Sequence, residues 1–280
     1  MRRLILLFLL LAGPLAAAPR VASTIAPLDG LVTQIMQGVG EPSSLVPPNL
    51  DPHDFSLRPS QISALGEADI VFAVGLDLEP WLARVEGDFI TVNLGEVTSE
   101  ALPARNFDLS TREDSDPHLW LDPGEMILWA LEITQRLITL NPENTAQYRT
   151  NEFALLKTLV SAKERLEAIG ARLETANIRL VVSHDAYQYL ERRLGLENIG
   201  ILTDINGTRA GARSLSNISR LEGAICILES PETLAAASLL PQAPRARIDL
   251  TGAEIAGEPD FVPRYYQSLA EALESCLEAG

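Results

Sequence analysis

The chain has only three histidines, and all three lie in segments that suit metal binding. His53 and His118 each end an Asp-Pro-His tripeptide, at 51–53 and 116–118. His184 follows the apolar run 180–183, which predicts a buried strand. Neutral imidazole is a common protein ligand for metals, and carboxylates are the usual partners of ligating imidazoles. We therefore predict that His53, His118 and His184 converge on one metal ion.

Each histidine alone also has an ordinary structural explanation. His53 suits a loop or packing position before a helix capped by Ser60, and His118 suits a turn at the edge of the core. His184 suits a helix N-terminus in contact with Asp185. The recurrence of one tripeptide in two separate loops favours metal binding over these explanations.

Asp249 is the predicted fourth ligand, through a carboxylate oxygen. It follows the last predicted strand, and ligands of open parallel sheets bind beyond the carboxyl ends of the strands. An N-cap or a salt bridge is the alternative role at such a position. Asp51, Asp54 and Asp185 are rivals because each lies within two residues of a histidine, but adjacency favours a hydrogen bond to an imidazole. Three imidazoles and one carboxylate suit tetrahedral Zn²⁺, whereas manganese prefers more oxygen ligands.

The elements that must hold these residues alternate between strands and helices. Helical patterns at 31–38, 60–68 and 186–190 lie between apolar runs that predict strands. These runs are 21–25, 70–74, 89–94, 178–183, 199–202, 224–228 and 246–250. The alternation implies mainly parallel sheets covered by helices on both faces. We predict an α/β fold of two similar lobes, an N-terminal lobe at 19–140 and a C-terminal lobe at 177–280.

The longest helical pattern lies between the lobes, in a connecting segment at 141–176. Asn141 suits an N-cap and Pro142 suits the first helical position. Apolar residues then recur at intervals of three, four or their sums, which predicts one connecting helix from 142 to about 175. The alternative is two helices separated at Gly170.

Residues 1–18 have the composition of a cleaved signal peptide. Arg2 and Arg3 precede a short apolar run, and small residues follow up to Ala18. The run is too short to span a bilayer, and no later stretch reaches about 20 apolar residues. Because no cysteine follows to accept a lipid, we predict a soluble periplasmic protein without a lipid anchor. The net charge of −16 argues against nucleic acid and anionic membranes as partners and is compatible with attracting cations.

The two cysteines, Cys226 and Cys276, agree with export. An even number of cysteines in an exported protein favours a disulfide. Two buried free thiols are the alternative. Zinc binding by these thiols is disfavoured because neither belongs to a Cys-x-x-Cys pair.

Three of these segments together resemble a known family. Segments 50–60, 118–123 and 183–187 are similar to those of the metal-binding solute receptors of ABC transporters, and in particular to the periplasmic receptors of zinc importers. The resemblance covers nearly all of the mature chain. It implies two α/β lobes joined by one long helix, with the metal in the cleft between them. His53 and His118 would come from the first lobe and His184 and Asp249 from the second.

The same resemblance bears on the disulfide and the metal. Cys226 and Cys276 match the second-lobe disulfide of the zinc receptors. The manganese receptors of the family typically have a carboxylate at the position of His184, which favours zinc here. Two segments depart from the family pattern: 103–116 is short and contains acidic residues but no histidine, and 203–211 is more polar than usual. The first departure puts an auxiliary zinc site in doubt.

The predicted function is therefore an exported, non-enzymatic receptor. It would act as a monomer that captures Zn²⁺ and delivers it to the membrane permease of an ABC importer. The alternatives are a manganese or iron receptor of the same family and, from a different class, an exported zinc hydrolase. The chain has no His-Glu-x-x-His helix and no general base with an identifiable role near a histidine motif, which disfavours the hydrolase. A purely structural role for zinc is a third interpretation, in which the metal would not be released.

Overall fold

The structure is a computed structural model that describes residues 17–53, 55–85, 87–230 and 240–278. Most of the predicted signal peptide, residues 1–16, lies outside the described residues, as does Asp54. Among the described residues, no helix has both the length and the apolar character needed to cross a membrane.

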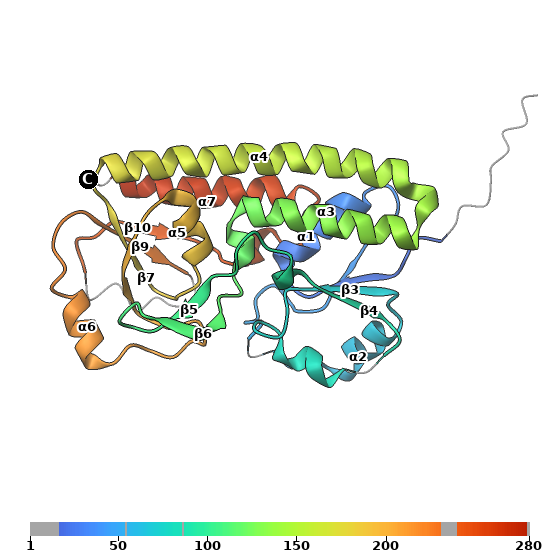
Figure 1. The fold of residues 1–280 in the computed structure, drawn as a ribbon, viewed down its shortest axis with the longest axis horizontal. Coiled ribbons are helices and arrows are strands. Elements are labelled where there is room, and N and C mark those ends of the chain that lie inside the picture. Colours follow the sequence, from blue (N-terminus) through green and yellow to red (C-terminus); the bar gives the residue numbers. More distant parts are fainter. Residues whose placement is uncertain (1–16, 54, 86, 231–239, 279–280) are drawn as a thin grey trace, which may run out of the picture.

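Two four-stranded parallel sheets form the centres of two lobes (Figure 1). The first sheet has the order β2-β1-β3-β4 and the second has the order β8-β7-β9-β10, so both use the same order of connections. The strands are β1 Val21–Ser23, β2 Ser43–Ser44, β3 Ile70–Ala73, β4 Ile90–Asn93, β7 Arg179–Val182, β8 Asn198–Ile201, β9 Ile225–Glu229 and β10 Arg245–Arg247. The predicted α/β fold with two similar lobes is confirmed.

The central strands of both sheets are buried, as is typical of parallel strands that helices cover on both faces. All four residues of β3 are buried, and all five of β9. Helices cover these sheets, namely α1 Ala26–Met36, α2 Pro59–Gly66, α5 Gln188–Leu194 and α6 Ala212–Ile218. Helix α1 begins about a turn earlier than predicted, with a proline in its first turn. Helix α2 already includes Ser60, so the prediction that Ser60 caps this helix is wrong.

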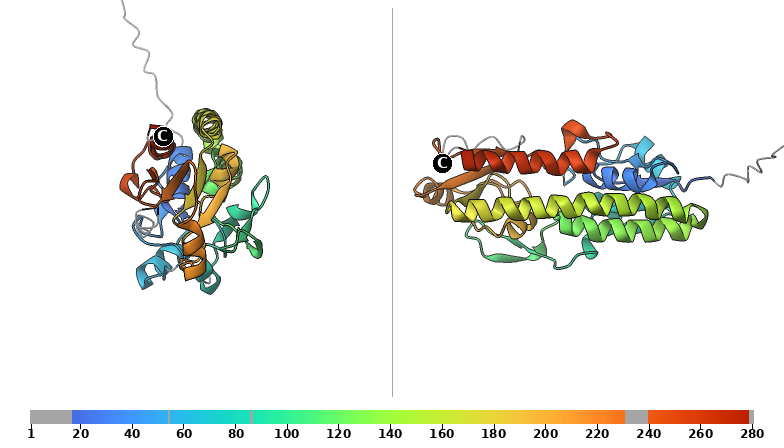
Figure 2. Two further views of the ribbon diagram at one scale, coloured as in Figure 1. Left: turned by 90° about the vertical axis from the view of Figure 1, so that its left-hand side faces the viewer. Right: turned by 90° about the horizontal axis from the view of Figure 1, so that it is seen from above.

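One long helix, α4 Thr145–Thr175, runs along both lobes (Figure 1). Its 31 residues give a length of about 47 Å. Helices α3 Pro123–Leu140 and α7 Phe261–Glu278 lie beside it (Figure 2). Together these three helices make the connection between the lobes a packed layer of helices.

Helix α4 differs from the prediction at its start and agrees with the prediction at Gly170. Residues Pro142–Asn144 form a separate 3₁₀ turn, η4, and the Asn141 side chain bonds to side chains and not to the backbone of α4. Asn141 is therefore not the N-cap of the long helix. The helix continues through Gly170, so the alternative of two helices is wrong. A side chain at position 170 would collide with the backbone carbonyl of Leu194 in α5, so this position requires glycine.

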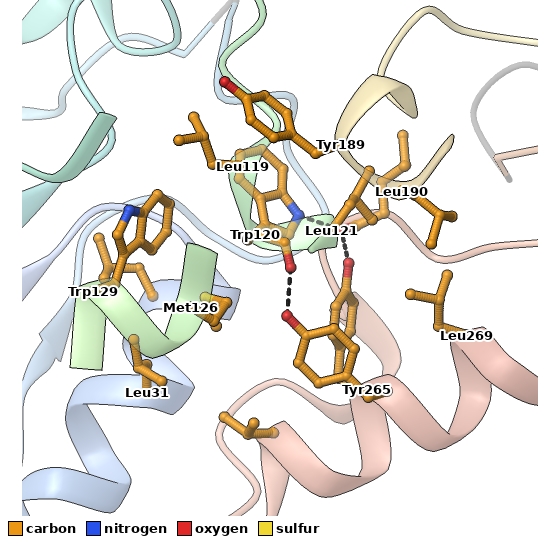
Figure 3. Close-up of a cluster of buried hydrophobic side chains, with 14 of the residues drawn as sticks. Leu31, Leu119, Trp120, Leu121, Met126, Trp129, Tyr189, Leu190, Tyr265 and Leu269 are labelled. Carbon is orange, nitrogen blue, oxygen red and sulfur yellow. Dashed lines mark hydrogen bonds between the residues drawn. The ribbon is translucent and has the colours of Figure 1, made fainter. Parts of the chain in front are cut away.

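The main hydrophobic core is shared by both lobes. Figure 3 shows Trp120 among side chains from α3 and α5 and near α7. The Trp120 Nε1 donates to the Leu250 carbonyl at 2.8 Å, and the Tyr266 hydroxyl donates to the Trp120 carbonyl at 2.7 Å. At the other side of the core, the Phe261 ring of α7 packs directly on Gly30 of α1.

A separate hairpin lies outside both large sheets. It consists of β5 Pro103–Arg105 paired in antiparallel fashion with β6 Thr111–Ser115. Short 3₁₀ turns complete the secondary structure: η1 Pro80–Arg84, η2 Leu94–Glu96, η3 Leu119–Leu121 and η6 Ala253–Ile255. The predicted disulfide is confirmed, since Cys226 of β9 is bonded to Cys276 of α7 with their Cα atoms 5.7 Å apart.

Candidate metal centre

The structure brings the three histidines together between the lobes. One ligand atom from each of His53, His118 and His184 lies within 4.8 Å of the others. The ring centroids of His53 and His118 are 5.5 Å apart, and those of His118 and His184 are 5.4 Å apart. In the described part of the chain, this is the one group of three or more such side chains close enough to hold a metal ion.

The repeated tripeptide has the same local conformation at both sites. In each, the aspartate Oδ1 accepts a hydrogen bond from the backbone N–H of the histidine two residues later, at 2.9 Å for Asp51 to His53 and for Asp116 to His118. This is the Asx-turn, in which a short carboxylate side chain replaces a backbone acceptor. The proline between them fixes its own φ and restricts the preceding aspartate. The tripeptide therefore presents a histidine from a loop whose backbone is held locally.

The His118 ring is oriented by a second bond to the same carboxylate. Its Nδ1 lies 2.7 Å from Asp116 Oδ1, and both side chains are buried. When Asp116 is ionised its Oδ1 accepts, so that Nδ1 carries the proton and Nε2 is left with its lone pair. This carboxylate–imidazole arrangement is typical of metal-binding histidines.

His184 is held at the carboxyl end of β7. The Asp185 N–H donates to the Thr203 carbonyl at 2.9 Å, which ties the segment to the loop after β8. The Asp185 side chain is fully buried and pairs with Arg105. Asp185 is thus occupied as an ion-pair partner and does not face the histidine cluster as a ligand.

Burial keeps the imidazoles of His118 and His184 neutral. It lowers the pKa of both His118 and His184 to about 3, and for His184 the neighbouring histidines add to this lowering. At neutral pH a cation therefore displaces no proton from either of these two rings. Burial also raises the pKa of Asp116 to about 7. A bound cation would favour the charged form of such a carboxyl group.

The three histidines line a small cavity of about 110 Å³. Its walls also include Asp51, Trp120, Ser230 and Leu250, so residues of both lobes enclose it. A larger hollow of about 670 Å³ beside Cys276 contains none of the histidines and is lined mainly by apolar residues. The small cavity is therefore the candidate metal site.

Asp249 lies next to this cavity and not in it. It lines a neighbouring cavity of about 450 Å³ with Glu229 and Arg247, and its Oδ2 accepts from the Glu254 N–H at 3.1 Å. Leu250 and Thr251, the next two residues, do line the histidine cavity. Of the rival carboxylates, Asp51 lines the histidine cavity and Asp185 pairs with Arg105. The structure thus groups the three predicted histidines and leaves Asp249 one cavity away.

Two residues near the site have roles that sequence reasoning missed. Trp120 packs against His118 with ring centroids 5.2 Å apart, and Arg105 joins the hairpin to the second lobe. The proximity of Trp120 to His118 in the sequence was a signal for the first. Arg105 gave none, because its partners lie about 80 residues later in the chain.

Comparisons with known proteins place the chain in a family. The family described as "zinc-uptake complex component A periplasmic" matches residues 21–225. A relative from Paracoccus denitrificans, the "high-affinity zinc uptake system protein ZnuA", is 27% identical over 94% of this chain and 93% of its own.

Two solved structures share the fold. One is the FpvC solute-binding protein of Pseudomonas aeruginosa in complex with Mn²⁺, with a TM-score of 0.77 and 19% identity, covering 94% of this chain and 98% of that one. The other is the periplasmic zinc-binding protein TroA from Treponema pallidum, with a TM-score of 0.72 and 22% identity, covering 91% and 99%. This shared fold holds different metals in different proteins, so the metal must be argued from the ligands.

Proposed function

The chain belongs to the periplasmic zinc-uptake complex component A family, and we propose that it captures one Zn²⁺ ion in the periplasm and delivers it to the permease of an ABC importer. The observation that carries this proposal is the convergence of three imidazoles from both lobes on one cavity, two of which, His118 and His184, are kept neutral by burial. Proteins of this family are receptors that bind and carry a solute. In this proposal the ion is cargo, and the site performs no chemical step on another substrate.

The ligand types support zinc over manganese. Zinc is commonly four-coordinate with nitrogen ligands, whereas manganese sites contain more carboxylate and carbonyl oxygen. His53, His118 and His184 offer three nitrogens within the cavity, and among the described residues that line it Asp51 is the only carboxylate.

We propose that Asp249 supplies the fourth ligand when the ion is bound. Its chain neighbours Leu250 and Thr251 already line the cavity. The following turn contains Gly252 at φ 67°, a conformation that glycine adopts without strain. A local adjustment of 249–252, with loss of the bond from the Glu254 N–H, would bring the carboxylate to the cavity. Asp51 is the competing candidate.

Metal analysis and competition titration test the proposed function. Protein purified from the periplasm without added metal is expected to contain one equivalent of zinc and to retain it against a strong chelator. His118→Ala should lose this zinc, while Arg136→Gln, at an exposed ion pair on α3, should keep it. Zinc uptake by cells should require both the receptor and its permease. Absence of bound zinc, or tighter retention of manganese, would refute the assignment.

A further inference from the structure

The β5–β6 hairpin belongs to the first lobe in sequence but packs on the second. In Figure 1 it lies across the second lobe, and the view from above in Figure 2 shows it on one side of that lobe. Its contacts with that lobe include three points along its length. The Leu102 N–H donates to the Tyr189 hydroxyl at 3.1 Å, Arg105 pairs with two carboxylates, and Arg112 lies 3.8 Å from Asp204.

Arg105 makes the most extensive of these contacts. Its Nε lies 3.1 Å and 3.3 Å from the two Asp185 oxygens, and its Nη1 and Nη2 lie 2.6 Å and 3.1 Å from the two Glu191 oxygens. The exposed fraction of the side chain is 13% for Arg105, 0% for Asp185 and 6% for Glu191. A planar guanidinium that hydrogen-bonds to two carboxylates in this way makes a specific, directional contact.

On each side of this contact, the chain continues into a segment that carries a histidine of the candidate metal site. Asp185 is the residue after His184. Strand β6 runs into Asp116, which orients His118, and the Asp116 N–H bonds to the Leu102 carbonyl at 2.8 Å to close the base of the hairpin. The hairpin thus joins a histidine segment of one lobe to a histidine segment of the other.

We propose that the β5–β6 hairpin is a clasp between the lobes and that Arg105 is a positioning residue that sets the rate at which the bound cation leaves. This inference rests on the proposed function of the same site. Release requires the His184 segment to separate from the His53 and His118 segments. The clasp opposes that separation, because breaking it leaves two buried carboxylates without their counter-charge.

The clasp also gives a role to the polar segment 203–211. Asp204 accepts hydrogen bonds from the Asn206 and Thr208 N–H groups, which hold the loop in a tight turn, and Arg112 of the hairpin approaches the same carboxylate. Gly207 at the tip of this turn lines the histidine cavity. The outer end of the hairpin therefore touches the loop that forms one wall of the site.

The test is the rate of zinc release from the full exported protein into excess chelator, measured by stopped flow. Arg105→Gln is expected to accelerate release about tenfold, the size of a typical coupling between sites. Arg192→Gln is the matched control, because Arg192 also joins the lobes, at Asp122 and Glu125, without contacting the residue beside His184. We expect it to change the rate less than about twofold, because Asp122 keeps its bond to Arg193 and Glu125 keeps its bond to Ser99.

Two further measurements separate positioning from general loosening of the fold. The visible spectrum of the Co²⁺-loaded protein reports ligand geometry, and Arg105→Gln should shift it while Arg192→Gln should not. Asp185→Asn should accelerate release by a similar factor, and combining it with Arg105→Gln should add little because both remove one contact. If Arg105→Gln does not fold, Asp185→Asn and Arg105→Lys carry the same test.

The outcomes distinguish this inference from the proposed function. Wild-type protein that holds no zinc would refute the proposed function. Wild-type protein that holds zinc, with an unchanged release rate in Arg105→Gln and Asp185→Asn, would refute the clasp alone. Equal acceleration by Arg192→Gln, or additive effects in the double variant, would also overturn the positioning role.

Discussion

At the scale of single residues, the Asp-Pro-His tripeptide explains why the site could be found in the sequence. Each copy of the tripeptide forms an Asx-turn from its own residues. His53 and His118 could therefore be recognised without knowledge of the tertiary structure. The oxygen ligand has no such local signature. Asp249 and Asp51 are both acidic residues at loop positions, and only the position of the bound ion can choose between them.

Replacing Asp249 by alanine tests that choice. If Asp249 moves to the ion, Asp249→Ala should weaken zinc binding about tenfold through loss of the oxygen ligand, and Asp51→Ala should weaken it less. His118→Ala should have a larger effect than either, because water can occupy a vacated oxygen position. Competition titration of the three variants gives the ranking. An unaffected Asp249→Ala together with a weakened Asp51→Ala would transfer the fourth position to the first lobe.

Glu79 gives a pH-dependent prediction away from the metal site. Its carboxyl group is fully buried, accepts from the Gly75 N–H at 2.7 Å and bonds to the Thr24 hydroxyl. Burial raises the pKa of Glu79 from 4.5 to about 7. Between these values the folded chain keeps a proton that the unfolded chain releases, so stability falls as the pH rises through this interval.

Glu79→Gln should remove this part of the pH dependence. Wild-type protein is expected to lose up to about 3 kcal/mol of unfolding free energy between pH 4.5 and 7 relative to the variant. Urea unfolding at several pH values, with chelator present, measures the difference between the two curves. Asp77→Asn, at an exposed neighbouring carboxylate, should run parallel to wild type. Parallel curves for Glu79→Gln would contradict the buried, protonated state.

At the scale of elements, the sequence predicted what depends on local pattern. All seven predicted strands correspond to strands in the structure, because continuous apolar runs are typical of parallel sheets. The β5–β6 hairpin was missed, since Thr111–Ser115 is polar and gains its order from Arg105 and its partners on the second lobe. The contacts between the hairpin and the second lobe are tertiary, and the periodicity of apolar residues in the sequence does not predict them.

Gly170 is a second example of a tertiary contact that the sequence pattern does not predict, in this case within a helix. The sequence pattern predicted one helix through Gly170 but gave no reason for a glycine there, and the structure shows that it is the point where α5 approaches α4 closely. Gly170→Ala should therefore destabilise the protein by about 1–3 kcal/mol, because the new methyl group meets the Leu194 carbonyl. This is opposite to the usual gain from alanine in a helix.

The neighbouring Ala171, exposed on the same helix, is the matched control for helix propensity. Ala171→Gly should cost up to about 1 kcal/mol. Thermal or urea unfolding of both variants measures the effects. Stabilisation by Gly170→Ala would mean that the two helices are not in close contact at this point.

At the scale of the whole molecule, the packed helices α3, α4 and α7 limit how far the lobes can move. Helix α4 is continuous from one lobe to the other, and the disulfide fixes α7 to the second sheet. Zinc binding should therefore adjust loops and the lobe angle slightly, and not produce a wide hinge closure.

Small-angle scattering of metal-free and zinc-loaded protein checks this expectation. The radius of gyration should change by less than about 1 Å, as for other preorganised binding proteins. Over the same titration the melting temperature should rise, since zinc binds only the folded chain. A contraction of several ångströms would show that the helical layer bends.

The contact between Gly30 and Phe261 has a consequence for how the chain folds. The core of the first lobe is completed by the last helix, and the main hydrophobic cluster contains residues from both sheets and from α1, α3, α4 and α7. The two lobes are therefore a single cooperative unit, and the first half of the chain cannot reach its final packing until the C-terminal helix has been synthesised.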